Sequence, residues 1–132
     1  MTELQKILDV LWKGALILDV RTRKEYAEGH FNNAINIPTP LPPLKDCDIY
    51  RLVVDLHNAT KKYCRHFPVI LYCKKGIRAE KAKEILECLG HTKVINVGGI
   101  EDEPMKSIVQ KGGLIARHPT KGRVLHLHWI KS

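Results

Sequence analysis

A cysteine that is followed within five residues by two lysines, a glycine and an arginine is the part of this sequence best suited to chemistry. The segment reads Cys73-Lys74-Lys75-Gly76-Ile77-Arg78. A thiol reacts as its thiolate, and nearby cations and the start of a helix both stabilise that anion. A glycine permits a turn in which backbone N–H groups converge and form an anion-binding concavity. The segment therefore predicts a nucleophilic cysteine, exposed at the end of a strand, that meets a bound anion.

The neighbouring segments support this interpretation over its main alternative, an inert buried cysteine followed by a solvated basic loop. Residues 69–72 form a short apolar run that is typical of a buried parallel strand, and residues 78–89 have the apolar spacing of a helix. Cys73 thus lies between a strand and a helix. Ligands of parallel α/β folds sit at the carboxyl ends of strands, where Asp19 also ends a predicted strand.

The remaining pattern predicts strands that alternate with helices, which indicates an α/β fold with a mainly parallel sheet. Besides the strand and helix around Cys73, we expect helices at 4–11, 22–29, 49–63 and 101–110, and strands at 15–20, 34–37 and 93–97. Thr2 with Gln5, and Thr22 with Glu25, form capping boxes for the first two helices.

The tail allows more than one interpretation. Residues 114–117 and 124–130 could pair as a hairpin around 119–122, and the second segment alternates apolar and polar residues. It could equally be an edge strand, or a segment that docks on another subunit, which makes a homodimer through the tail a prediction to test. We divide the chain into a domain at 1–113 and a C-terminal extension at 114–132, which is either part of the same globular unit or a docking tail.

Several motifs together resemble the rhodanese family over most of the chain, about residues 7–112. They are Leu18-Asp19-Val20-Arg21, Glu25-Tyr26, Gly29-His30, Ala34-Ile35-Asn36-Ile37-Pro38, the Cys73 to Arg78 loop, and Val97-Gly98-Gly99-Ile100. The resemblance implies a single-domain sulfurtransferase with a five-stranded, mostly parallel sheet flanked by helices. Rhodanese domains often carry a tryptophan soon after the Gly-Gly turn, and residues 101–105 have none.

The resemblance also implies roles for the site residues. Cys73 would attack the outer sulfur of thiosulfate or a similar donor and carry it as a persulfide, which cyanide, a small thiol or a protein cysteine then takes. Backbone N–H groups from Lys74 through Gly76 and Ile77 to Arg78 would bind the substrate's negative charge. Arg78 would steady both loop and anion, Asp19 and Arg21 would brace the loop, and the two lysines would favour doubly charged thiosulfate.

Two other functions remain open at this level. Rhodanese modules also serve non-catalytic docking or regulation, although inactive versions usually lose the cysteine that this chain keeps. In related cysteine phosphatases and arsenate reductases, the active-site loop is one residue longer, because a phosphoryl group needs a wider cradle. The loop from Cys73 to Arg78 has the shorter form, which favours sulfur transfer.

The overall composition sets limits on partners. The net charge of +8 favours anions, but aromatic residues make up only 6% and the basic residues are scattered among acids, so we expect a small anionic donor rather than nucleic acid.

Residues 1–11 resemble no signal or transit peptide and no run suits a membrane, so we expect a cytoplasmic protein. We predict no cofactor, no metal site at His126 and His128, and no disulfide. We expect Cys88 to pack close to the inward face of its helix and Cys64 to be exposed.

Overall fold

Twelve elements follow one another along the chain in the computed structural model, which describes residues 2–118 and 120–132. Helices and strands alternate through most of its length, as predicted. The order is α1 (Glu3–Trp12), β1 (Leu16–Asp19), α2 (Arg23–Glu28), β2 (Gly29–Phe31), β3 (Ile35–Asn36), α3 (Asp46–Thr60), β4 (Val69–Cys73), α4 (Ile77–Cys88), β5 (Val94–Gly99), α5 (Met105–Gln110), β6 (Gly113–Arg117) and β7 (Val124–Lys131).

The central sheet is parallel and has the strand order β3-β1-β4-β5. Its register places Asp19 beside Asn36 on one side and beside Tyr72 on the other. The predicted α/β fold is confirmed, but the expectation of five strands is wrong, because four strands form this sheet in the described part of the chain. The nearest further strand, β2, pairs antiparallel with β7 instead.

The tail forms the predicted hairpin, in which β6 and β7 pair antiparallel from Gly113↔His128 to Arg117↔Val124. The outer edge of β7 then pairs with β2 of the same chain, from Gly29↔Lys131 to Phe31↔Trp129. Together they form a second sheet of order β2-β7-β6. The tail therefore docks on its own chain through β7, and the homodimer through the tail stays a prediction.

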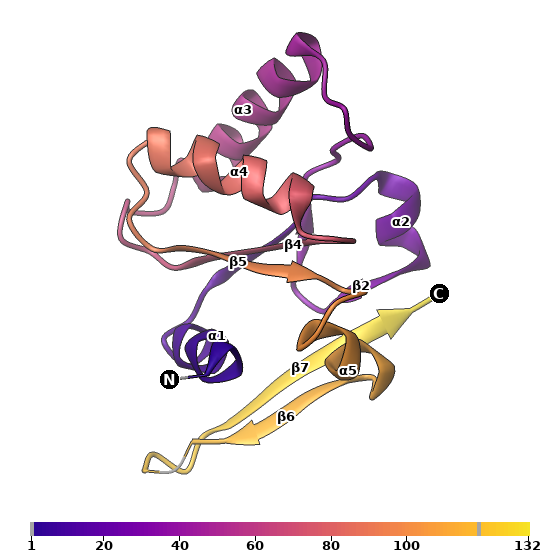
Figure 1. Ribbon diagram of the computed structural model, residues 1–132. Helices are drawn as coiled ribbons and strands as arrows, with labels where there is room; N and C mark the ends of the chain where they lie inside the picture. Colours follow the sequence, from indigo (N-terminus) through magenta and orange to yellow (C-terminus); the bar gives the residue numbers. More distant parts are fainter. Residues whose placement is uncertain (1, 119) are drawn as a thin grey trace.

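Figure 1 shows three layers with the parallel sheet in the middle. Helices α3 and α4 cover one face, while α1, α5 and the antiparallel sheet lie on the other. Each interface has its own apolar core, because the parallel strands are apolar on both faces. The first core contains Leu18, Leu71 and Leu86, and the second contains Ile70, Tyr72 and Leu127 of the tail.

Helix starts follow the capping signals closely. The hydroxyls of Thr2 and Thr22 accept the N–H groups of Gln5 and Glu25, whose side chains bond back, so both predicted capping boxes are confirmed. Helix α3 starts three residues before the predicted position, because its first turn is polar and shows no apolar period. Helix α5 starts four residues late, since Pro104 disfavours helical backbone in the residue before it.

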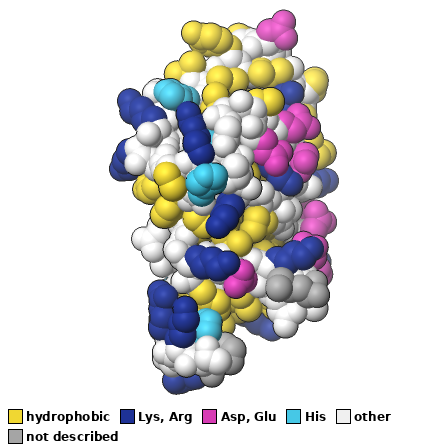
Figure 2. Space-filling view, turned by 90° about the vertical axis from the view of Figure 1, so that its left-hand side faces the viewer, with side chains coloured by type: hydrophobic (Ala, Val, Ile, Leu, Met, Phe, Trp, Pro, Cys, Tyr) yellow, Lys and Arg dark blue, Asp and Glu magenta, His cyan; other side chains and the backbone are white. Residues whose placement is uncertain are grey.

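The positive charge of the chain comes from two stretches. No Asp or Glu occurs in residues 56–79 or in residues 104–132, and the first stretch includes the Cys73 loop. On the face shown in Figure 2, His and many Lys and Arg side chains lie on the left, whereas Asp and Glu lie mostly on the right together with further Lys and Arg. No helix in the described residues is both long and apolar enough to cross a bilayer.

Shortening a side chain at the centre of the first core should cost much of the stability. Leu71 in β4 is 0% exposed, and Leu71→Ala should lower the free energy of unfolding by about 2–5 kcal/mol. Ile115, which is 69% exposed, is the matched control, and Ile115→Ala should change it by about 0.5 kcal/mol or less. Urea denaturation measures both, and equal losses would contradict this account of the core.

Candidate active site

The carboxyl ends of the parallel strands meet at one edge of the sheet, as the sequence predicts. Asp19 ends β1, Cys73 ends β4, and Gly99 ends β5 beside Cys73. The segment after Cys73 crosses this edge and leads into α4, whose N-cap is Gly76. The candidate nucleophile therefore lies between a strand end and a helix start.

Backbone amides converge on the sulfur of Cys73. Its Sγ accepts the N–H of Gly76 at 2.9 Å and that of Ala79 at 3.4 Å. The expectation of an exposed sulfur is wrong, however, since Cys73 is 1% exposed. The cause is that β4 is buried at all five positions and the loop folds back over its end.

The turn of this loop depends on Gly76. Its φ of 90° lies in the left-handed region, which side chains other than glycine rarely adopt. In the described part of the chain, the N–H groups of Lys74, Lys75, Ile77 and Arg78 have no acceptor. They are free donors at the start of α4, where an anion is stabilised by such groups and by the helix dipole.

The end of β5 and the two residues that follow it bond to the start of the loop. The carbonyls of Cys73 and Lys74 accept the N–H groups of Ile100 at 2.9 Å and Glu101 at 3.2 Å. A Cβ atom at Gly99 would lie 2.2 Å from the Lys74 carbonyl oxygen, so only glycine permits this approach. The Gly-Gly pair that was predicted as a turn thus ends β5 as strand, and its role is to let the loop come close.

Asn96 of β5 supports the other end of the loop and was missed by the sequence reasoning. Its Nδ2 donates to the Gly76 carbonyl at 3.1 Å, and its Oδ1 accepts the N–H of Gly98 at 2.8 Å. The side chain thus ties the left-handed residue of the loop to β5. An asparagine in a strand, one residue before the Val97-Gly98-Gly99 motif, was the signal that could have found it.

The Arg78 guanidinium, at the end of the loop, is directed at Glu25 and Thr39. Arg78 is 3% exposed, and its guanidinium donates to Glu25 Oε1 at 2.7 Å, to Glu25 Oε2 at 3.1 Å and to the Thr39 carbonyl at 3.2 Å. These contacts fit the expected loop-steadying role, and because the cation is paired with Glu25, the expected side-chain contact with a substrate anion stays a prediction. The sequence identified Glu25 as a capping residue and as part of a family motif, but not as the partner of Arg78, because the two residues are 53 positions apart.

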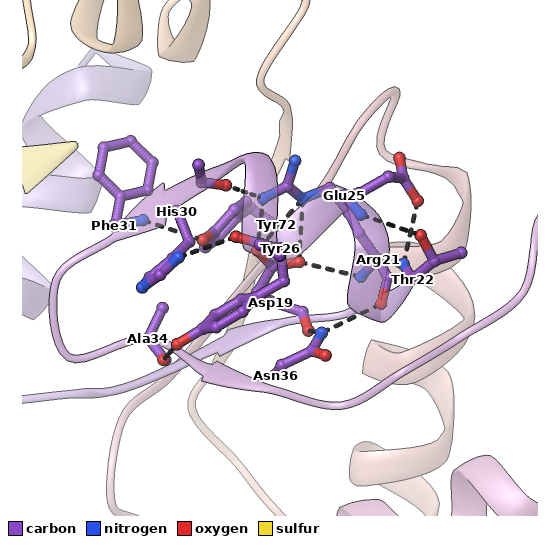
Figure 3. A network of polar contacts seen from close by, with 12 residues as sticks. Asp19, Arg21, Thr22, Glu25, Tyr26, His30, Phe31, Ala34, Asn36 and Tyr72 are labelled. Atoms are coloured by element: carbon purple, nitrogen blue, oxygen red, sulfur yellow. Dashed lines mark hydrogen bonds and ion pairs between the residues drawn. The ribbon is translucent and has the colours of Figure 1, made fainter. Parts of the chain in front are cut away.

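Asp19 and Arg21 bind each other rather than the loop (Figure 3). The Arg21 guanidinium donates to Asp19 Oδ2 at 2.7 Å and to the Gly29 carbonyl at 2.6 Å, and both side chains are buried. In the described residues neither side chain bonds to the 74–78 loop, which corrects the predicted brace. The guanidinium carbon also lies 5.7 Å from the centre of the Tyr72 ring and 5.6 Å from that of Trp129. The pair therefore joins the site edge to the C-terminal hairpin.

Three residues of the loop reach the surface, namely Lys74, Lys75 and Ile77. Lys74 lies 3.7 Å from Glu101, with both side chains about half exposed. Two hollows flank the loop. One, of about 320 Å³, borders Lys74, and the other, of about 750 Å³, borders Lys75 and Ile77. The loop thus stands as a ridge whose two sides are accessible.

The other cysteines and the tail histidines lie outside this edge. Cys47, Cys64 and Cys88 are all exposed, so the expected inward packing of Cys88 is wrong while the exposure of Cys64 is confirmed. The rings of His126 and His128 stack at 5.6 Å between centroids. Among the described residues no three His, Cys, Asp or Glu side chains are placed to hold a metal.

Comparison with known proteins identifies the family. The Rhodanese-like domain model matches residues 2–102. The chain belongs to the rhodanese family. This rhodanese domain is 35% identical over 91 residues to thiosulfate sulfurtransferase PspE of Escherichia coli K12, across 69% of this chain and 76% of PspE. The resemblance stated from the motifs is therefore confirmed.

Solved structures give the same fold. A rhodanese with anions from E. coli matches with a TM-score of 0.54 and 30% identity, across 70% of this rhodanese and 94% of that chain. The human single-domain sulfurtransferase TSTD1 matches with a TM-score of 0.54 and 25% identity, across 73% and 86%. A tRNA uridine(34) hydroxylase of Hamiltonella defensa is 35% identical over 85 residues, but the match covers only 22% of that longer protein.

The Arg78–Glu25 pair predicts a specific loss of stability in acid. Partial burial by itself raises the pKa of Glu25, but the hydrogen bonds and charge of Arg78, together with Thr22, lower it from 4.5 to about 2. Because the folded-state pKa is depressed, the stabilisation is present above about pH 4.5 and is lost as the pH falls toward 2.

Glu25→Gln keeps the capping box and removes the titrating charge. Its free energy of unfolding in urea, measured from about pH 6 down to pH 3, should fall less steeply than that of the wild type. Glu87→Gln, at an exposed position of α4, is the matched control and should follow the wild type. If the free energies of unfolding of the wild type and Glu25→Gln changed equally with pH, the Glu25–Arg78 pair would not be the source of the acid sensitivity.

Proposed function

We propose that this rhodanese is a sulfurtransferase that takes sulfane sulfur from thiosulfate or a similar small anionic donor and holds it on Cys73 as a persulfide. A thiol, a protein cysteine or cyanide then accepts the sulfur. The observation that carries the proposal is the convergence of the Gly76 and Ala79 N–H groups on Cys73 Sγ. N–H groups in that position are donors that can hold a negatively charged sulfur, and the thiolate is the nucleophilic form. The 35% identity to a thiosulfate sulfurtransferase supports the same chemistry.

In the first half-reaction the Cys73 thiolate attacks the outer sulfur of thiosulfate. A new S–S bond forms, the S–S bond within thiosulfate breaks, and sulfite leaves with that electron pair. The persulfide that remains carries one negative charge on its terminal sulfur. The free N–H groups of Lys74, Lys75, Ile77 and Arg78 are the donors available to hold that charge.

In the second half-reaction the acceptor attacks the terminal sulfur. The bond between that sulfur and Cys73 Sγ breaks, and Sγ leaves as a thiolate that the two amides again stabilise. Two displacements at one cysteine form a covalent ping-pong cycle. Neither displacement needs a metal or an organic cofactor to balance.

The competing functions fit the site less well. A purely non-catalytic module would not need the amides of Gly76 and Ala79 directed at a cysteine. A phosphatase or arsenate reductase needs space for a tetrahedral oxyanion around the nucleophile, whereas Cys73 is 1% exposed beneath a short loop. Nucleic-acid binding, a homodimer and a cytoplasmic location remain predictions, and the conclusion depends on none of them.

A persulfide should form on one cysteine only. After treatment with thiosulfate and removal of the donor, the intact mass of the wild type should increase by one sulfur atom, and cyanide should remove it as thiocyanate. Cys73→Ser should show neither change, whereas Cys88→Ser should behave as the wild type, because Cys88 is an exposed thiol at the far end of α4. Sulfur loading of Cys73→Ser, or hydrolysis of an aryl phosphate lost only in that variant, would refute the proposal.

The exposed lysines of the loop, Lys74 and Lys75, should act mainly on the binding of the anionic donor. Lys75→Gln should raise the KM for thiosulfate several-fold with a smaller change in kcat, and added salt should reduce the difference from the wild type. Lys61→Gln, an exposed lysine beyond the end of α3, is the control for net charge and should leave KM unchanged. Equal effects of the two substitutions would show that only net charge matters.

A further inference from the structure

The C-terminal hairpin forms one wall of the hollow beside the Cys73 loop. This hollow of about 320 Å³, here named the Trp129 hollow, is lined by residues that include Arg21, Glu28, Gly29, Lys74, Glu101 and Trp129. Lys74 follows the nucleophile directly, whereas Trp129 comes from β7. The family match ends at residue 102, so Trp129 belongs to a part of the chain that the match does not include.

Packing from three sides holds the Trp129 ring in place. Its centroid lies 4.9 Å from that of Phe31 in an edge-to-face arrangement, and the Arg21 guanidinium carbon lies 5.6 Å from it. Gly29 leaves room for the indole, since a Cβ there would lie 2.8 Å from the Trp129 Nε1 atom. The half-buried indole is therefore a rigid aromatic surface at the mouth of the site.

The charges in the hollow leave one carboxylate without a partner. The charge of Arg21 is balanced by Asp19, that of Glu25 by Arg78, and that of Lys74 by Glu101. Glu28 is exposed, and no ion pair engages it within the described residues. Its backbone carbonyl accepts the N–H of Ser132, which places Glu28 next to the end of β7.

A carboxylate beside an aromatic side chain is a combination that binds aminothiols, through charge pairing with the ammonium group and through packing of the carbon chain against the indole. We propose that the Trp129 hollow binds the sulfur acceptor, and that it selects thiols that carry an ammonium group. This inference rests on the proposed function, because the acceptor takes its sulfur from the Cys73 persulfide. Glu28 and Trp129 determine specificity, and they have no part in the chemical step.

The transfer to such an acceptor balances without a further reactant. The thiol proton of the aminothiol passes to the negatively charged terminal sulfur of the persulfide, and the resulting thiolate attacks that sulfur and forms a new S–S bond. The bond between that sulfur and Cys73 Sγ breaks, and its electron pair returns to Sγ as the thiolate. The product is the hydropersulfide of the aminothiol, and its ammonium group remains charged throughout.

The test compares, as acceptors for protein that has been loaded with sulfur, three thiols in which two methylene groups separate the sulfur from the end group. Cysteamine carries an ammonium group, 2-mercaptoethanol a neutral group and 3-mercaptopropionate a carboxylate. At equal thiolate concentrations, the wild type should prefer cysteamine over 2-mercaptoethanol by about tenfold in kcat/KM, mainly through KM. Glu28→Gln and Trp129→Leu should each reduce this ratio by about two- to fivefold.

Reversal of the charge at position 28 gives the most discriminating test, because this position is exposed and its substitution should not impair folding. Glu28→Lys should shift the preference from cysteamine toward 3-mercaptopropionate, whereas Glu87→Lys, a charge reversal on α4, should keep the wild-type order. A wild type without preference for cysteamine, or the same order of thiols in Glu28→Lys and the wild type, would overturn the inference. If the wild type gains no sulfur from thiosulfate in the mass measurement, the proposed function itself has failed.

Discussion

Two backbone N–H groups directed at one buried sulfur are the contact on which the rest of this site depends. The sulfur of Cys73 accepts from Gly76 at 2.9 Å and from Ala79 at 3.4 Å, and these bonds exist only while the loop keeps its tight turn. The same geometry leaves the neighbouring amides free at the start of α4, where a second anionic atom can be held.

The turn is maintained by elements that lie far apart in the sequence. Helix α2 contributes Glu25, whose carboxylate holds Arg78 at the start of α4. Strand β5 contributes Asn96, which bonds to the loop carbonyl at Gly76, and Gly99, which lets the loop approach the strand. The loop therefore has the rigidity that a positioned nucleophile needs, although it lies at the surface of the sheet edge.

The hairpin at the end of the chain joins this arrangement through the buried Arg21. Arg21 binds Asp19 at the end of β1 and the Gly29 carbonyl in β2, and its other contacts are the rings of Tyr72 and Trp129. Burial, followed by the charge of Asp19, raises the pKa of Tyr72 well above its ordinary value, so its phenol stays neutral. The buried Asp19–Arg21 pair thus connects the part of the chain that matches the family to the C-terminal hairpin, which lies beyond the match. This connection gives the tail a place at the mouth of the site.

The sequence alone determined the candidate nucleophile, the short loop and the alternating α/β pattern, because these depend on residues that are close together in the chain. Cys73 and Gly76 could be interpreted from spacing, strand and helix signals alone. The partner of Arg78, the pairing of β2 with β7 and the position of Trp129 were decided only by the tertiary structure. A buried cation takes whichever carboxylate the fold brings to it, and an alternating strand pairs with any free edge of suitable register. Local sequence holds no information on either choice.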